Sequence, residues 1–194
     1  MVGHSRGANI SVLFAAVMPE KVQALVALDS LSVVPSELTF VQTLRNFMDQ
    51  TRSQKAKSPR VFATIDEYLR RRISQGNSEL VSNALAPRAL QAKDNGFALR
   101  GDKRMFASSA VKLSQQDIDA VLGSIHCPVL NIWASEGIRY KSSELDKIAS
   151  RAKNLIEIYE SVELIGDHHF HLEPKTASEI AETMIEFLTK HNLL

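Results

Sequence analysis

The chain has 194 residues, 44% of them hydrophobic and 23% charged, and its 23 Lys and Arg nearly cancel its 22 Asp and Glu. The net charge of +1 excludes the strong field of a protein that binds nucleic acid or an anionic membrane, so we expect a small-molecule partner. No run of residues approaches the roughly 18 apolar residues of a membrane-spanning helix. The single cysteine, Cys127, and the lack of a visible secretory signal predict a cytoplasmic protein.

The chain opens on a G-x-S-x-G pattern, Gly3-His4-Ser5-Arg6-Gly7, and an apolar run that stops before Pro19 follows it. Such a run predicts a buried helix. In a strand-to-helix turn of this kind the serine hydroxyl projects above a sheet, and small flanking residues let strand and helix approach closely. We therefore predict that Ser5 is a nucleophile, that Gly3 and Gly7 allow the close approach, and that the backbone N–H of Arg6 stabilises an oxyanion. The alternative is a chance match in a glycine-containing loop.

The rest of the chain alternates short apolar runs with helical patterns. Residues 22–28 and 127–134 are dense apolar runs typical of strands covered on both faces, and residues 156–165 fit a last strand. Residues 142–152 and 176–190 have helical spacing, whereas residues 35–124 form a polar, mostly helical insert. We predict an α/β fold with a parallel sheet of about three strands, built from residues 1–34 and 125–194 and interrupted by the insert.

A histidine-rich loop, Gly166-Asp167-His168-His169-Phe170-His171, follows the last predicted strand. A serine hydroxyl is a weak nucleophile without a base, and the order serine first, histidine last is that of α/β-hydrolases. We predict His168 as the base, with His169 as the second choice. The alternative is a metal site or a simple polar loop. Three histidines within four residues rarely converge on one ion without a further ligand elsewhere, so we expect no metal and no cofactor.

Four segments, VGHSRGA, LVALD, CPVLNIW and GDHHFHLEP, together resemble the C-terminal part of the α/β-hydrolase fold family. The insert around residues 95–104 is similar to that of the serine hydrolase-like proteins in this family. The resemblance implies a Ser-His-acid triad that acts on a small ester-like substrate. It also implies that residues 35–124 are a cap that covers the site and shapes substrate choice.

The acid of the triad has two candidates. In the family it commonly follows a pattern like PVLxIWGxxD, but the matching stretch here is PVLNIWASEG, with Gly137 where the aspartate would stand. Asp29, at the end of the strand after the first helix, occupies a position that some lipases of this fold use, and we prefer it. Glu136 is the other candidate. An aspartate at a strand end also often caps a turn, which is the alternative interpretation of Asp29.

In this fold about half of the strands normally precede the nucleophile, including the strand that leads into it. In this sequence only four residues precede Ser5. We therefore expect a truncated hydrolase whose strand at residues 22–28 lies at an open sheet edge and whose activity is impaired. The first alternative is an inactive hydrolase-like protein that acts as a binding or interaction module. The second is an unrelated α/β binding protein with a coincidental motif.

Overall fold

A computed structural model describes residues 1–58 and 60–194. The chain forms two compact units: the core unit, residues 1–35 and 113–194, and the insert unit, residues 36–112. The second boundary lies at residue 112 rather than at the expected residue 124. The reason is helix α5 (Gln115–Gly123), whose Ile118 and Leu122 are fully buried against the hydrophobic core of the core unit.

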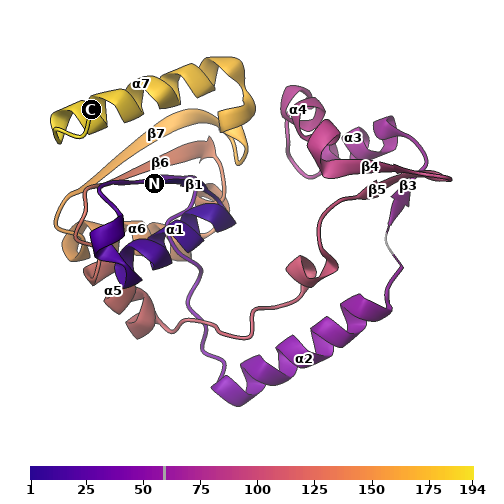
Figure 1. Ribbon diagram of the computed structural model, residues 1–194, viewed down its shortest axis with the longest axis horizontal. Helices are drawn as coiled ribbons and strands as arrows, with labels where there is room; N and C mark the ends of the chain where they lie inside the picture. Colours follow the sequence, from indigo (N-terminus) through magenta and orange to yellow (C-terminus); the bar gives the residue numbers. More distant parts are fainter. Residues whose placement is uncertain (59) are drawn as a thin grey trace. The chain divides into compact units, whose positions relative to one another are not determined.

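The core unit contains a parallel sheet of four strands in the order β1-β2-β6-β7 (Figure 1). The strands are β1 (Val2–His4), β2 (Leu25–Leu28), β6 (Val129–Glu136) and β7 (Tyr159–Asp167). The α/β fold with its parallel sheet is thus confirmed, with one strand more than expected. Strand β1 leads directly into Ser5 and pairs with β2, so β2 is an interior strand and the expectation of an open edge there was wrong.

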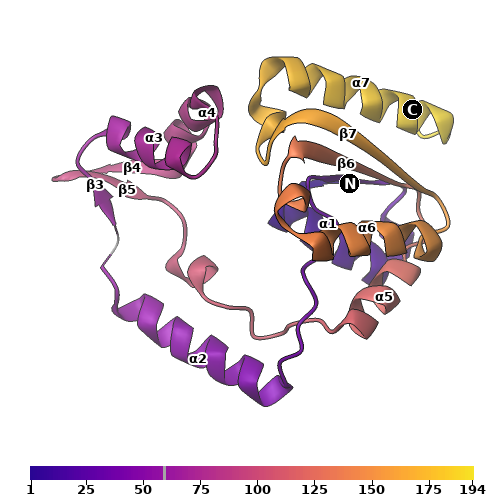
Figure 2. The same cartoon turned by 180° about the vertical axis from the view of Figure 1, so that it is seen from behind.

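Helices cover both faces of this sheet (Figures 1 and 2). Helices α1 (Arg6–Val17), α5 and α6 (Ser143–Leu155) pack on one face, and α7 (Pro174–Lys190) packs on the other. Successive strand residues point to opposite faces, so Leu25 and Ala27 belong to the first core while Val26 and Leu28 belong to the second. Among the described residues, no helix combines the length and the apolar character needed to cross a membrane.

The insert unit is not as uniformly helical as the sequence predicts. It contains the helices α2 (Phe40–Ala56), α3 (Ile65–Ser74) and α4 (Glu79–Ala89). It also contains an antiparallel sheet in the order β3-β5-β4, formed by β3 (Val61–Phe62), β4 (Leu90–Lys93) and β5 (Gly96–Leu99). These strands have two to four residues, which is too short for a period of two to stand out in the sequence.

Candidate active site

Ser5 lies on a sharp turn between β1 and α1. Its φ of 53° and ψ of −123° are rare for a residue with a side chain, and such strain is concentrated at functional sites. Two backbone hydrogen bonds hold the turn: the Ser5 N–H donates to the Leu28 carbonyl at 3.0 Å, and the Ser5 carbonyl accepts from the Asn9 N–H at 3.1 Å. Arg6 is the first residue of α1, so its N–H lies at the positive end of the helix dipole.

The two glycines of the pattern have different roles. A Cβ atom on Gly3 would lie 2.6 Å from the Gly7 carbonyl oxygen and 2.7 Å from the Ala8 nitrogen, so only glycine lets β1 and α1 approach this closely. A Cβ atom on Gly7 would meet nothing within 4 Å. The predicted steric role therefore holds for Gly3 and is wrong for Gly7, which contributes its backbone to the contact and does not require the absence of a side chain.

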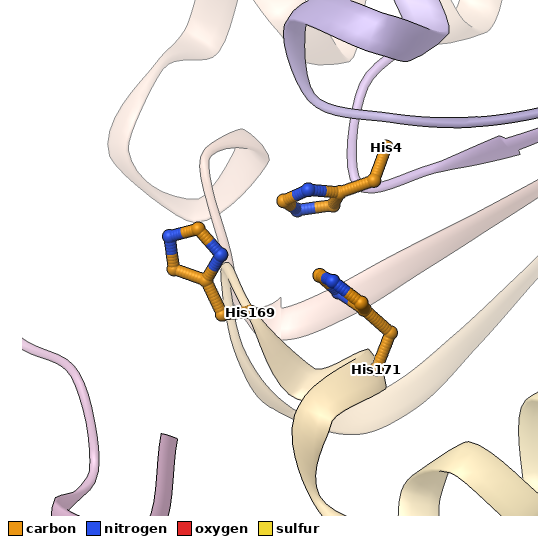
Figure 3. A group of neighbouring side chains, drawn as sticks. All are labelled: His4, His169 and His171. Carbon is orange, nitrogen blue, oxygen red and sulfur yellow. The ribbon is translucent and has the colours of Figure 1, made fainter. Parts of the chain in front are cut away.

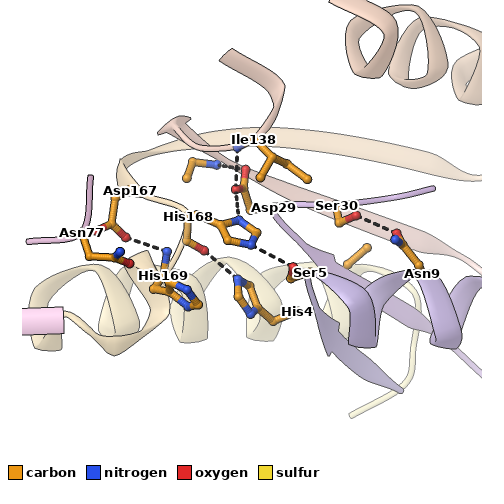
Figure 4. A network of polar contacts seen from close by, with 12 residues as sticks. His4, Ser5, Asn9, Asp29, Ser30, Asn77, Ile138, Asp167, His168 and His169 are labelled. Atoms are coloured by element: carbon orange, nitrogen blue, oxygen red, sulfur yellow. Dashed lines mark hydrogen bonds and ion pairs between the residues drawn. The ribbon is translucent and has the colours of Figure 1, made fainter. Parts of the chain in front are cut away.

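His168 joins Ser5 to Asp29 across the carboxyl ends of the strands (Figure 4). The His168 Nε2 lies 2.8 Å from the Ser5 Oγ, and the His168 Nδ1 lies 2.6 Å from the Asp29 Oδ2. A carboxylate only accepts hydrogen bonds, so Nδ1–H donates to Asp29 and Nε2 is left to accept the Ser5 hydroxyl proton. The residues come from three loops that follow β1, β2 and β7, and the structure brings all three together.

Asp29 is held by backbone donors as well as by His168. Its side chain is fully buried, and its Oδ1 and Oδ2 accept hydrogen bonds from the N–H groups of Ala134 at 3.1 Å and Ile138 at 3.0 Å. Its own N–H donates to the Ile132 carbonyl at 2.7 Å, and its φ is 43°. A buried carboxylate is tolerated only when its oxygens are satisfied in this way. These contacts fix the orientation of the carboxylate toward His168.

The other acid candidate, Glu136, lies at the end of β6 and is exposed to solvent. The carboxylate at the His168 Nδ1 is that of Asp29. The next residue, Gly137, is buried, and its missing side chain matters: a Cβ atom there would overlap both carboxylate oxygens of Asp29. Sequence reasoning treated Gly137 only as a lost acid and missed this contact.

His4 is a further member of the site that sequence reasoning missed. Its Nε2 lies 2.6 Å from the His168 carbonyl oxygen and therefore donates a hydrogen bond to it. Burial, and then the neighbouring His171, lower the pKa of His4 to about 3. Burial also lowers the pKa of His171, with His168 as the next cause. These two imidazoles are therefore neutral near pH 7. The only signal in the sequence was the position of His4 beside Ser5.

A buried amide supports the loop that carries Asp29. Asn131, in the middle of β6, is fully buried, and its Nδ2 donates to the carbonyl oxygens of Ala27 at 2.9 Å and Ser30 at 3.3 Å. The Tyr159 hydroxyl donates to the Asn131 Oδ1 at 2.9 Å, and burial raises the pKa of Tyr159 to about 12. The signal for this support was the single polar residue inside the apolar run VLNIW.

Fold and site together define an α/β protein that places a serine, a histidine and an aspartate in one hydrogen-bond chain at the carboxyl edge of a parallel sheet. The model of the alpha/beta hydrolase fold family matches residues 1–174. The chain therefore belongs to the α/β-hydrolase fold family.

Individual relatives agree with this assignment. The chain is 26% identical over 197 residues to a serine hydrolase-like protein of Danio rerio, an alignment that covers 96% of this chain and 60% of that protein. It is 23% identical to a serine hydrolase-like protein of Dictyostelium discoideum, in an alignment that covers 97% of this chain and 55% of that protein. A crystal structure of a hypothetical protein from Pseudomonas aeruginosa PAO1 superimposes with a TM-score of 0.86 at 25% identity, covering 97% of this chain and 66% of the other. The chain thus spans 55 to 60% of the length of these curated relatives.

Proposed function

We propose that the protein is a serine hydrolase that cleaves small ester-like substrates, with Ser5 as the nucleophile, His168 as the general base and Asp29 as the group that orients His168. The observation that carries the proposal is the continuous chain of hydrogen bonds from the Ser5 hydroxyl through His168 to the buried Asp29. A nucleophile, its base and an orienting acid within hydrogen-bond reach are the signature of nucleophilic catalysis. The strained backbone of Ser5 at the start of α1 is a second, independent support.

In this proposal the Ser5 Oγ attacks the acyl carbonyl carbon while its proton passes to the His168 Nε2. The carbonyl oxygen becomes an oxyanion that the Arg6 N–H stabilises, and Asp29 stabilises the positive charge on the imidazole. Collapse of the intermediate expels the alcohol, which takes the proton from Nε2 and leaves an acyl group on Ser5. Water, deprotonated by the same nitrogen, then releases the acid and restores the hydroxyl.

Labelling by a fluorophosphonate probe tests the proposal, because the probe reacts with an activated serine and needs no knowledge of the natural substrate. The sequence predicts impaired activity partly because the strand that leads into Ser5 was expected to be missing, but β1 supplies that strand. We therefore expect the chain to be labelled and to hydrolyse p-nitrophenyl acetate, and we expect Ser5→Ala to lose both. Ser150→Ala, a change of an exposed serine on α6, is the matched control and should keep both. A folded chain that the probe does not label would favour the alternative of a hydrolase-like protein that binds a partner without turnover.

A further inference from the structure

Three imidazole side chains, those of His4, His169 and His171, lie close together (Figure 3). The cluster adjoins the catalytic pair, because the ring centroids of His4 and His168 are 4.7 Å apart. His4 comes from β1, while His169 and His171 come from the loop after β7, so two segments far apart in the chain supply the cluster. One ring nitrogen from each residue lies within 4.8 Å of the others. His4 brings an imidazole from outside the loop next to those of His169 and His171, and the sequence does not show this proximity because some 165 residues separate the two segments.

The spacing of the rings fits a single metal ion. Tetrahedral coordination with Zn–N bonds of about 2.0 Å places ligand nitrogens about 3.3 Å apart and imidazole centroids about 5 Å apart. The centroids here are separated by 4.1 Å for His4 and His171, 5.1 Å for His4 and His169, and 6.0 Å for His169 and His171. The ring nitrogens, which lie within 4.8 Å of one another, must therefore move closer together to bind one ion, and both rotation of the side chains and a shift of the segments that carry them contribute to this movement.

The contacts of His4 and of His171 leave one ring nitrogen on each of these two residues for a metal. The His4 Nε2–H donates to the His168 carbonyl, which fixes the tautomer and leaves the lone pair of Nδ1 available. A backbone carbonyl is one of the usual partners of the second ring nitrogen of a metal-binding histidine. The His171 Nδ1 is enclosed by protein, yet it has no hydrogen-bond partner among the residues that the structure describes. An enclosed ring nitrogen without a partner is costly unless a ligand satisfies it.

We propose that His4, His169 and His171 bind a divalent transition-metal ion of the class that prefers imidazole, such as Zn²⁺, and that the bound ion inhibits the reaction at Ser5. Three protein ligands leave a fourth coordination position for water. The inhibitory part rests on the proposed function and follows from chain connectivity. His4 immediately precedes Ser5, and His169 immediately follows His168. Drawing the ligand nitrogens together therefore shifts the two segments that align the Ser5 Oγ with the His168 Nε2.

Direct metal titration tests the site without any assay of activity. After treatment with a chelator, the full chain is titrated with Zn²⁺ by calorimetry and with Co²⁺ by visible absorption, whose intense bands report tetrahedral coordination. We expect one ion per chain, and we expect His169→Ala and His171→Ala each to weaken binding by at least about 10-fold. His126→Ala, which removes an exposed histidine outside the cluster, should bind as the wild type does. Circular dichroism verifies that each variant is folded.

Two results would overturn the site: equal Zn²⁺ affinity in all of these variants, or binding that is lost in His168→Ala but kept in His169→Ala.

The inhibitory part is tested by the rate of fluorophosphonate labelling with and without Zn²⁺. We expect saturating Zn²⁺ to slow labelling of the wild type at least about 10-fold. In His169→Ala, saturating Zn²⁺ should change the labelling rate much less, compared with the same variant without metal. Binding without slower labelling would refute inhibition alone. A chain that is never labelled would refute the proposed function and inhibition, whereas the titration would still decide the metal site.

Discussion

The carboxylate of Asp29 fills the space that a side chain at Gly137 would occupy. A Cβ atom on Gly137 would overlap both oxygens of Asp29, which reaches this point from the end of the neighbouring strand. The ends of β2 and β6 therefore cannot both carry a side chain here. In the sequence pattern of the family the acid stands at the position of Gly137. In this chain the acid is at residue 29, and its carboxylate has room only because residue 137 is a glycine.

The first prediction concerns Gly137→Ala. The added methyl group must displace the Asp29 carboxylate, which would break its bonds to His168 and to the backbone. A misplacement of about 1 Å in a catalytic group can cost about 100-fold in rate, and we expect a loss of that order in fluorophosphonate labelling. Gly123→Ala is the control, because a Cβ atom there meets nothing within 4 Å. Equal labelling rates in the two variants would show that Asp29 does not need the space.

The second prediction compares the two acids. Asp29→Asn preserves size but can no longer hold the imidazole in the correct tautomer, and the matching change in a well-studied triad costs about 10⁴-fold in turnover. We expect hydrolysis of p-nitrophenyl acetate to fall by a similar factor. Glu136→Gln changes an exposed side chain at the end of β6 and should cost less than about 3-fold. If Glu136→Gln proved the more damaging variant, the role of Asp29 would be wrong.

The third prediction separates the two glycines of the turn by stability. Gly3→Ala forces a methyl group into the backbone of Gly7 and Ala8, and overpacking of this kind costs about 1 to 3 kcal/mol of unfolding free energy. Gly7→Ala adds a methyl group in open space within helix α1, where alanine is favoured over glycine by up to about 1 kcal/mol. Urea denaturation should show changes of opposite sign. A Gly7→Ala variant destabilised as much as Gly3→Ala would contradict this assignment.

Much of the core unit was predictable because its elements follow from buried apolar runs. Strands covered on both faces produce runs such as LVAL and VLNIW, and the helical spacing of Ile180, Met184 and Leu188 indicates the apolar side of α7, which packs on the second core. The G-x-S-x-G pattern and the last histidine loop likewise identified Ser5 and His168, which the structure places in contact. Asp29 was the preferred acid for its position at a strand end, and it too lies in contact with His168.

The remaining features depend on contacts between distant segments, which composition and periodicity do not encode. Strand β1 has three residues and is recognisable only by its pairing with β2. The boundary at residue 112 depends on where Ile118 packs, and the function of Gly137 depends on where Asp29 points. The cytoplasmic location, the truncation and the role of the insert as a cap stay predictions.

The last prediction concerns alkaline pH and the partly buried phenol of Tyr159. Burial raises its pKa from an ordinary value of about 10 to about 12, so between these two pH values the unfolded chain has lost a proton that the folded chain keeps. The folded state then binds more protons than the unfolded state, and the unfolding free energy falls as pH rises from 10 to 12. Tyr159→Phe should reduce this slope in urea denaturation. At pH 7 the same variant should lose about 1 to 3 kcal/mol, because the Asn131 Oδ1 is left without the phenol donor. An unchanged slope would show that the pKa of Tyr159 is not the one that folding raises.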